Sequence, residues 1–350
     1  MSAWLALAVA LAFAPPALAG PERIAGARVA VRAAADPAPV LAALGTSGVE
    51  WAAWTVPGVA AVADLCCFGR DWRVRRCSLA GRNSGWGTRD DGAHPDDAAV
   101  ELLVLVEVAR GGARTVLPVG PSCPIDGAGR AVTWLDGVAA EASLALLDGI
   151  ARVHPARADD EPADAALAAL AYHRTPSADR LLAALAADAG LHRERRGQAL
   201  FWSGQLRGRA GYDLLDRTLA GETDDDLREE TLFALSESPV PEARPRLLRA
   251  AREDRAPEVR AQALFWLAES APDPEQAAAW ILDAIASDAD AEVREQGVFA
   301  LSQLEGGVAH LVRLLRENRD PELRRQALFW LGQSDDPRAL AELEQILAER

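Results

Sequence analysis

The sequence contains no lysine, because all 37 of its basic residues are arginine. A chain without lysine cannot form a Schiff base through an ε-amine, and it cannot supply the lysine of a phosphate-binding P-loop. None of the five histidines is followed by glutamate, so the H-E-x-x-H motif is absent, and no G-x-S-x-G motif occurs. These absences argue against the commonest enzyme classes, and the sequence predicts no catalytic residue, no metal ligand set and no cofactor.

Long apolar runs are scarce beyond Ala19. The stretch 1–19 is almost wholly apolar and closes on A-L-A, a small-x-small pattern that a signal peptidase can cut. We interpret 1–19 as a signal peptide; an uncleaved anchor or a buried N-terminal helix are the alternatives. No later run is long enough to span a bilayer. We therefore expect an exported protein, periplasmic or extracellular, with no integral membrane segment.

A basic field is also missing. The formal charge is −15, and most of the acid excess lies in residues 156–350. Proteins that bind the phosphates of nucleic acids need clustered positive charge, so a nucleic-acid partner is not expected. The acidity of this half indicates either a contribution to solubility or a partner that carries basic residues.

A repeat dominates that acidic half. The pentapeptide QALFW occurs at equal intervals, at 198–202, 262–266 and 326–330, and related segments lie midway at 230–234 and 296–300. Aligned on their phenylalanines, the five copies recur at intervals of about 32 residues, which is typical of helical-hairpin repeats. The clearest copy opens its two helices at Asp320-Pro321 and Asp336-Pro337, with Asp as N-cap and Pro in the first turn.

An arginine recurs five positions before each of these phenylalanines, with an acid two positions before the arginine. Stacked repeats would turn this pattern into a structural ladder of guanidinium groups and carboxylates at the helix starts. The arginines are Arg196, Arg228, Arg260, Arg294 and Arg324, and the acids are Glu194, Asp226, Glu258, Glu292 and Glu322.

The pattern DPE[VL]R…AL resembles the HEAT repeat, in the short form named after phycocyanobilin lyases, over about 160–350. The resemblance implies a mainly α fold: a right-handed α-solenoid of about six hairpins that acts as a scaffold for another protein. Relatives of these repeats include bilin lyases and a di-iron hydroxylase that uses His-Glu dipeptides as ligands. The sequence lacks those dipeptides, so a lyase or hydroxylase activity is the weaker alternative.

The aromatic residues of the repeat are its unusual feature. A helical wheel places Trp266 at the edge of the apolar face and Phe265 on the far side. Trp alternates with Ala at its position, as large-to-small packing requires, so we expect the Trp side chains in the core. The Phe side chains either form an exposed strip for a partner or pack between adjacent first helices. These candidate partner-binding residues are Phe201, Phe233, Phe265, Phe299 and Phe329.

The second helix of each repeat is expected to line the concave surface of the solenoid. One of these helices is rich in arginine, and Arg246, Arg249 and Arg252 are candidates for binding an anionic segment of a partner. A solvated helix face paired with nearby acids is the alternative.

Residues 20–155 have a different periodicity, which predicts a small α+β domain with an antiparallel sheet. A hairpin is expected at Gly111-Gly112, further strands within 23–34 and 129–138, and short helices within 37–45 and 139–153. The solenoid is expected over 160–350.

All four cysteines lie in this N-terminal region: Cys66, Cys67, Cys77 and Cys123. In an exported protein they favour two disulfides over a zinc site, because the C-x2-C spacing is absent. A bridge between neighbours is strained, which leaves Cys66 with Cys77 and Cys67 with Cys123, or the exchanged pairing.

The region with VEWAAWTVPGV…LCCFGRDW…RRC…PSC, followed by Phe-Trp repeats, resembles exported bacterial HEAT-repeat proteins with no assigned activity. An alternative function places ligand or envelope binding in this domain, through the loop 81–97, with the solenoid as a spacer. The sequence leaves the partner and the oligomeric state open.

Overall fold

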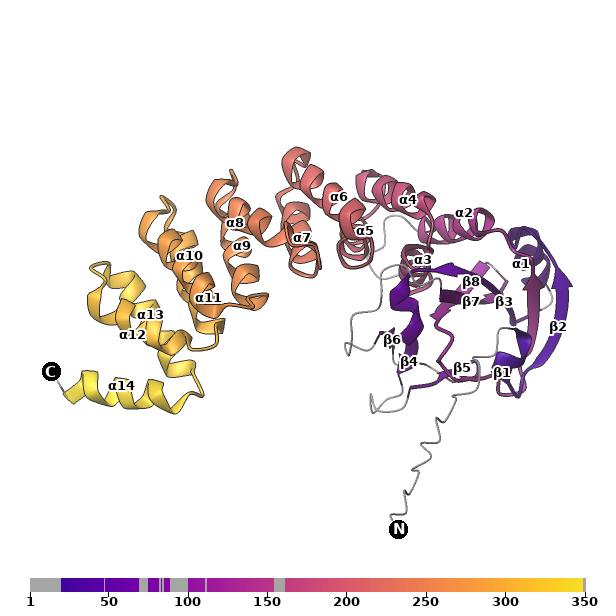
Figure 1. Ribbon diagram of the computed structural model, residues 1–350, viewed down its shortest axis with the longest axis horizontal. Helices are drawn as coiled ribbons and strands as arrows, with labels where there is room; N and C mark the ends of the chain where they lie inside the picture. The colour runs from indigo at the N-terminus through magenta and orange to yellow at the C-terminus, as the bar shows by residue number, and fades with distance from the viewer. Residues whose placement is uncertain are drawn as a thin grey trace, which may run out of the picture. The chain divides into compact units, whose positions relative to one another are not determined.

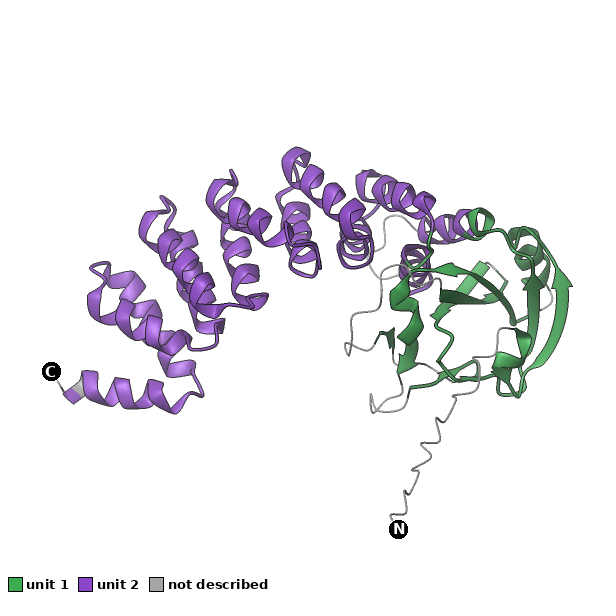
Figure 2. Ribbon diagram, viewed as in Figure 1, with its two compact units in different colours: residues 1–143, 172–174 green, residues 144–171, 175–350 purple. Residues whose placement is uncertain are grey.

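The computed structural model describes residues 20–46, 48–68, 75–81, 83, 85–88, 100–110, 112–153 and 161–348. The chain divides into two compact units (Figure 2): unit 1 is residues 1–143 with 172–174, and unit 2 is residues 144–171 with 175–350. The predicted signal peptide 1–19 and most of the loop 81–97 lie outside the described residues. Within the described part, no helix is both long and apolar enough to cross a membrane.

Unit 1 is built on a five-stranded sheet of order β2-β10-β3-β7-β8 (Figure 1). The strands are β2 (Arg28–Ala33), β3 (Glu50–Gly58), β7 (Val100–Ala109), β8 (Gly112–Val119) and β10 (Ala131–Asp136). The hairpin between β7 and β8 is formed where predicted, with Ala109 paired to Gly112. The expectation of an antiparallel sheet is wrong for one side, because β10 runs parallel to both β2 and β3. These strands are far apart in sequence, so no tight turn sets their relative direction.

Short elements complete unit 1. They are the 3-10 helices η1 (Pro21–Arg23) and η2 (Ala60–Asp64), the strands β1 (Ile24–Ala25), β4 (Cys66–Phe68), β5 (Cys77–Ser78), β6 (Gly85–Gly87) and β9 (Ile125–Asp126), and the helix α1 (Ala38–Leu44). Helix α2 (Ala140–Ala151) follows the sheet. Both short helices lie within the ranges that the sequence predicts.

Unit 2 contains six helical hairpins, as predicted. The first helices are α3 (Glu161–Ala171), α5 (Arg193–Leu206), α7 (Asp225–Ser236), α9 (Pro257–Glu269), α11 (Ala291–Gln303) and α13 (Pro321–Gln333). The second helices are α4 (Pro176–Ala187), α6 (Gly208–Gly221), α8 (Ala243–Glu253), α10 (Pro274–Ser287), α12 (Gly307–Glu317) and α14 (Pro337–Ala348).

Local sequence explains where these helices begin. Asp320 accepts a hydrogen bond from the Glu322 backbone N–H, and Pro321 occupies the first turn of α13, as expected for an Asp-Pro start. Asp224, Asp273 and Asp290 cap α7, α10 and α11 in the same way. Each cap satisfies one of the backbone donors that a helix leaves free at its N-terminus.

Successive first helices pack against one another along unit 2, whereas successive second helices make few contacts. Figure 1 accordingly shows α7, α9, α11 and α13 on the inner side of the curved array and α8, α10 and α12 on its outer side. The prediction that second helices line the concave surface is therefore wrong. Small residues allow the close approach of first helices: a Cβ on Gly204 of α5 would collide with the carbonyl of Ala234 in α7.

Candidate functional site

A continuous line of aromatic rings runs across five successive first helices, from α5 to α13. Neighbouring rings are 4.7 to 5.8 Å apart between centroids. We call this line the aromatic row; it consists of Phe201, Trp202, Phe233, Phe265, Trp266, Phe299, Phe329 and Trp330. Offset and edge-to-face ring pairs of this kind add about 0.5–1.5 kcal/mol each to simple burial.

Contacts within the aromatic row alternate with a period of two hairpins. Phe201 stacks on Phe233 with ring planes 12° apart, and Phe265 stacks on Phe299 with planes 2° apart. Between these stacks, Phe233 meets Trp266 and Phe299 meets Trp330 at tilted angles. The fully buried Ala234 and Ala300 occupy the Trp position in α7 and α11, as the spacing of the QALFW copies requires. Large and small residues therefore alternate along the row.

Seven of the eight rings are half-buried. The Trp side chains were expected in the core, but part of their surface is exposed. The Phe side chains of α5, α7, α9 and α11 pack between first helices, which was one of the two alternatives, and also keep part of their surface exposed. The helical wheel assigned Trp to the core and Phe to the opposite face. Each inner helix contacts neighbouring helices on both sides, so both positions are partly buried. The row is therefore at once a packing device and a partly open surface.

The row is most exposed at α13, where Phe329 is 52% exposed. Leu328 beside it is 45% exposed, whereas its counterparts in the preceding first helices are at most 1% exposed. Those counterparts are Leu200, Leu232, Leu264 and Val298. The last hairpin thus presents apolar surface that the others bury against a following helix.

Polar residues border the row on both sides. Positions three before and four after each Phe lie on the same helical face as the ring. They carry only glutamine or glutamate: Gln198, Glu230, Gln262, Gln296 and Gln326, then Gln205, Glu237, Glu269, Gln303 and Gln333. One turn further, the position seven before Phe is always acidic (Glu194, Asp226, Glu258, Glu292 and Glu322). On each of the five helices that carry the row, the face with the Phe ring therefore also carries an acid at the helix start and glutamine or glutamate on either side of the ring.

Glu230 is the most perturbed acid of this border. Its carboxylate packs onto Gly197 of the neighbouring α5, where a side chain would leave no room. Burial raises the pKa of Glu230 to about 7, nearby Glu194 adds to the rise, and Arg193, 3.5 Å away, opposes it. Near neutral pH this position therefore changes between a neutral and a charged group.

The predicted arginine ladder is formed in part, with other carboxylate partners: Arg196, Arg228 and Arg260 pair with acids, whereas Arg294 and Arg324 donate to backbone carbonyls. Arg260 donates two hydrogen bonds to Asp288, at 2.8 and 2.9 Å, and Arg228 donates to Asp254. These acids are the C-caps of the second helices, not the residues two positions before each arginine. The hydrogen bond from Arg260 holds the pKa of Asp288 below its usual range.

Each of these arginines also donates to a backbone carbonyl of the preceding hairpin, for example Arg260 Nη1 to Asp254 O at 2.9 Å. The ladder therefore locks consecutive hairpins together. The acids recur with the spacing of the phenylalanines (Glu222, Asp254, Asp288, with Asn318 at the last step), and this sequence signal could have identified them.

The arginine cluster of α8 lies on the outer side, and two of its three members are paired. Arg246 donates to Asp216 of α6 at 2.5 Å, and Arg252 donates to Asp283 of α10 at 3.2 Å. Arg249 is exposed and forms no ion pair with a described residue. These contacts fit the alternative interpretation of the cluster, a solvated helix face paired with nearby acids.

The four cysteines of unit 1 form two buried disulfides, Cys66 with Cys123 and Cys67 with Cys77. This is the exchanged pairing of the two that the sequence left open. The bridges lie side by side, with Cys77 Sγ 3.8 Å from Cys123 Sγ, inside the hydrophobic core of the unit. With every cysteine oxidised, the thiolates that a zinc site needs are absent.

Unit 1 also contains a buried polar chain that the sequence did not reveal. Trp54 Nε1 donates to Ser143 Oγ at 2.9 Å, and Ser143 Oγ lies 2.9 Å from His173 Nε2. All three side chains are fully buried. A serine beside a histidine can form a nucleophile and base pair, but here no substrate can reach it. The hydrogen bonds among Trp54, Ser143 and His173 instead give these buried polar groups the partners that they need in the core.

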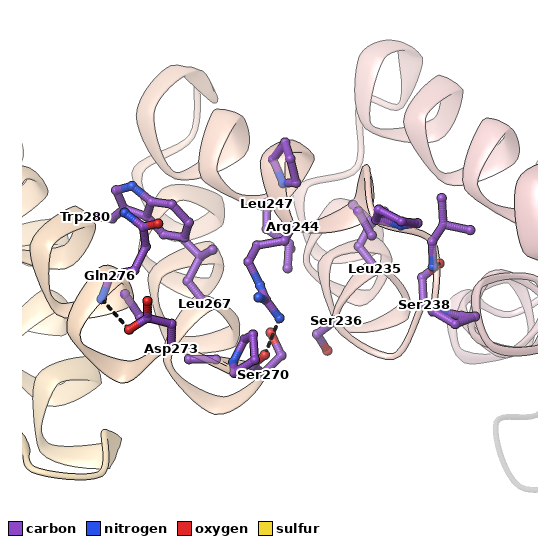
Figure 3. A pocket seen from close by; sticks show the side chains of 18 residues that line it. Leu235, Ser236, Ser238, Arg244, Leu247, Leu267, Ser270, Asp273, Gln276 and Trp280 are labelled. Carbon is purple, nitrogen blue, oxygen red and sulfur yellow. Dashed lines mark hydrogen bonds between the residues drawn. The ribbon is translucent and has the colours of Figure 1, made fainter. Parts of the chain in front are cut away.

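A pocket of about 470 Å³ lies in unit 2, between the hairpin α7–α8 and the hairpin α9–α10. Figure 3 shows Arg244 and Leu247 of α8 at its centre, with Trp280 on one side and Leu235 on the other. The loop between α7 and α8 contributes Pro239 and Pro241. No motif in the sequence marks this pocket.

Comparison with known proteins agrees with the repeat architecture. A family model described as HEAT repeats matches residues 213–302, from within α6 to within α11. Unit 2 contains HEAT repeats. These repeats follow an α+β unit that contains two disulfides. HEAT repeats are generally protein-interaction modules.

Two solved structures are similar in part. The complex of CpcE and CpcF of phycocyanin lyase from Nostoc sp. shares 21% identity, with 46% of this chain and 100% of that chain covered and a TM-score of 0.34. The crystal structure of Cex1p shares 13% identity, with 59% and 45% covered and a TM-score of 0.37. No curated protein matches the chain.

Proposed function

We propose that the protein is an exported, non-enzymatic scaffold that binds a segment of another protein along the aromatic row of its HEAT solenoid. The observation that carries the proposal is the continuous row itself, which combines partly exposed rings with a polar border on the inner helices. A contiguous apolar strip with a polar rim is typical of a protein-binding surface.

The border indicates the chemistry of the partner segment. The acids at the helix starts and the exposed Glu237 and Glu269 surround the rings with negative charge. A guanidinium or ammonium group over an aromatic face is attracted by the ring as well as by neighbouring carboxylates. We therefore expect a segment that alternates basic with apolar residues.

Two features of unit 1 support export and the absence of catalysis. Disulfides persist in oxidising compartments and are rare in the cytosol, which agrees with a cleaved signal at 1–19. The Ser143–His173 pair is closed to solvent, so its chemistry is unavailable to a substrate.

Site-specific photo-crosslinking in cells that express the full chain tests this function. A benzophenone side chain placed at Gln262, beside the row on α9, should capture a defined protein. The same group at the exposed Arg249, on the outer α8, is the matched control and should not capture it. Adding Phe329→Ser should weaken the capture at Gln262 while circular dichroism shows an intact fold.

The result that opposes the proposal is equally specific. Equal capture from Gln262 and Arg249, or no product from any position of the inner border, would show that the row is only a packing device.

A further inference from the structure

The pocket between α7–α8 and α9–α10 has an apolar interior. Its floor consists of the buried Leu235, Leu247 and Leu267, one from each of three helices, and Trp280 of α10 forms a side wall. Prolines in both loops complete the rim. The volume of about 470 Å³ is within the range of small-ligand sites.

Arg244 is out of keeping with its place in the repeat. In α8 it follows the buried Ala243 and precedes the buried Leu247, the pair that matches Ala277 and Ile281 in α10. Arg244 therefore occupies the position of Ala278, which is fully buried. A guanidinium stands where another hairpin places an apolar side chain.

The charge of Arg244 has no counter-ion among the described residues. Its Nη2 donates to the backbone carbonyl of Ser270 at 2.6 Å, as Figure 3 shows, and its Nε is buried with no hydrogen-bond partner. Asp273 also lines the pocket, but it caps α10 by accepting from the Gln276 backbone N–H at 3.1 Å. Burying a charge in an apolar site is costly unless it is paired.

An earlier hairpin shows the complete version of this arrangement. Asp179, which has the same register in α4, is the acceptor of a 2.6 Å hydrogen bond from Arg207 Nε at the end of α5. In the α8 hairpin the residue in this register is a base, and the facing loop after α9 reads Ser270-Ala271-Pro272-Asp273, whose single carboxylate caps α10. Among the described residues, no carboxylate forms an ion pair with Arg244, so this position has no counterpart of the Asp179–Arg207 pair.

We propose that the pocket around Arg244 binds a small apolar monocarboxylate, whose carboxylate supplies the missing acid and whose tail covers the leucine floor. The planar guanidinium fork matches a carboxylate bidentately. A single cation with Asp273 nearby suits a monoanion better than a phosphate dianion. This site is independent of the aromatic row, which lies on the inner helices.

Calorimetric titration of the full-length protein with octanoate tests the assignment, and octanol is the neutral probe of the same length. We expect octanoate to bind at least tenfold more tightly than octanol. Arg244→Met should weaken octanoate by at least tenfold and leave octanol nearly unchanged, because only the charge-assisted hydrogen bonds are lost. Arg249→Met, on the same helix but outside the pocket, should bind octanoate like the wild type.

Ala271→Trp provides a second variant that keeps Arg244 and fills the pocket from the facing loop; it should abolish octanoate binding. A short apolar peptide with a free C-terminus, compared with its amide, identifies the source of the carboxylate: tighter binding than octanoate assigns the site to a protein C-terminus, weaker binding to a free acid. Equal affinity for octanoate and octanol, full binding by Arg244→Met, or no binding of octanoate at millimolar concentration would overturn the proposal.

Discussion

The inner and outer helices of the solenoid are held to their neighbours by different forces. Inner helices join through the aromatic row and through small residues such as Gly204, which allow the backbones to approach closely. Outer helices stand further apart and join through long ionic side chains, as in Arg246 with Asp216 and Arg252 with Asp283. Short-range packing on one side and long-reach pairing on the other agree with the curvature of the array in Figure 1.

This difference shows that the solvent exposure of the contacting side chains, more than the number of contacts, determines how much each side of the solenoid contributes to stability. Packing of the half-buried rings removes apolar surface from water and adds ring contacts, whereas exposed ion pairs stabilise little because water and salt screen them. The arginine ladder is intermediate, because Arg228 and Arg260 are largely buried and each donates several hydrogen bonds.

Removing a ring from the middle of the row should have the largest effect. Trp266→Ala deletes ring contacts of 4.8 Å to both Phe233 and Phe265. We expect a loss of about 2–3 kcal/mol in the free energy of unfolding, less than for a fully buried tryptophan because part of the ring surface is exposed. Urea denaturation followed by circular dichroism measures it. Trp266→Phe is the conservative control, and a loss below about 1 kcal/mol for Trp266→Ala would mean that the row contributes little.

The next effect depends on pH and concerns the border of the row. The folded-state pKa of Glu230, about 7, is above the ordinary value of 4.5, so the folded state holds the proton more tightly. The resulting stabilisation is complete below pH 4.5 and is lost as the pH rises to 7. Glu230→Gln, which mimics the protonated acid, should match the wild type at pH 4 and be more stable at pH 8.

We expect a gain of about 1–2 kcal/mol for Glu230→Gln at pH 8, reduced from the full shift because the side chain is about a third exposed. Urea titrations at the two pH values measure it, with the exposed Glu237→Gln as the matched control. An equal stability difference at both pH values would contradict the buried-proton explanation.

Phe329→Ser, at the open end of the row, should cost less. The ring contacts Trp330 of its own helix and is 52% exposed. We expect a loss of about 0.5–1 kcal/mol in unfolding free energy. Comparison with Phe265→Ser in the same denaturation assay sharpens the contrast, because the Phe265 ring of α9 stacks on Phe299 of α11. Equal losses at the two positions would show that α13 is covered in solution.

The smallest effect is expected on the outer side. Arg252→Ala removes an ion pair in which both side chains are at least half-exposed. We expect a change within about 0.5 kcal/mol that disappears in about 1 M salt. A loss comparable to that of Trp266→Ala would remove the distinction between the two sides.

The sequence was sufficient to predict the parts of the fold that depend on local patterns. The phenylalanine spacing predicted the hairpins, the Asp-Pro pairs predicted helix starts such as Pro321, and Gly111-Gly112 predicted the β7–β8 turn. Each of these signals is contained within a short stretch of chain. The disulfide pairing was limited to two possibilities because neighbouring cysteines seldom join.

Features that depend on distant contacts could not be predicted in the same way. The parallel pairing of β10 with β2 joins segments that lie at opposite ends of unit 1 in the sequence. Which helices face inward depends on the distance between neighbouring helices. A helical wheel gives only the angular positions of residues in one helix, so it cannot predict that distance. The pocket at Arg244 arises because two loops from different hairpins meet around one substituted position.

The alternation of Trp and Ala along the row makes two hairpins, not one, the unit by which this array can grow or shrink. Deleting 257–288 alone would bring α7 next to α11, so that Ala234 and Ala300 become neighbours and the row loses a tryptophan without compensation. Deleting 225–288 would bring α5 next to α11 and restore the Phe201-type stack on Phe299, with Trp202 beside Ala300. Natural or designed variants of the solenoid should therefore differ in length by whole pairs of hairpins.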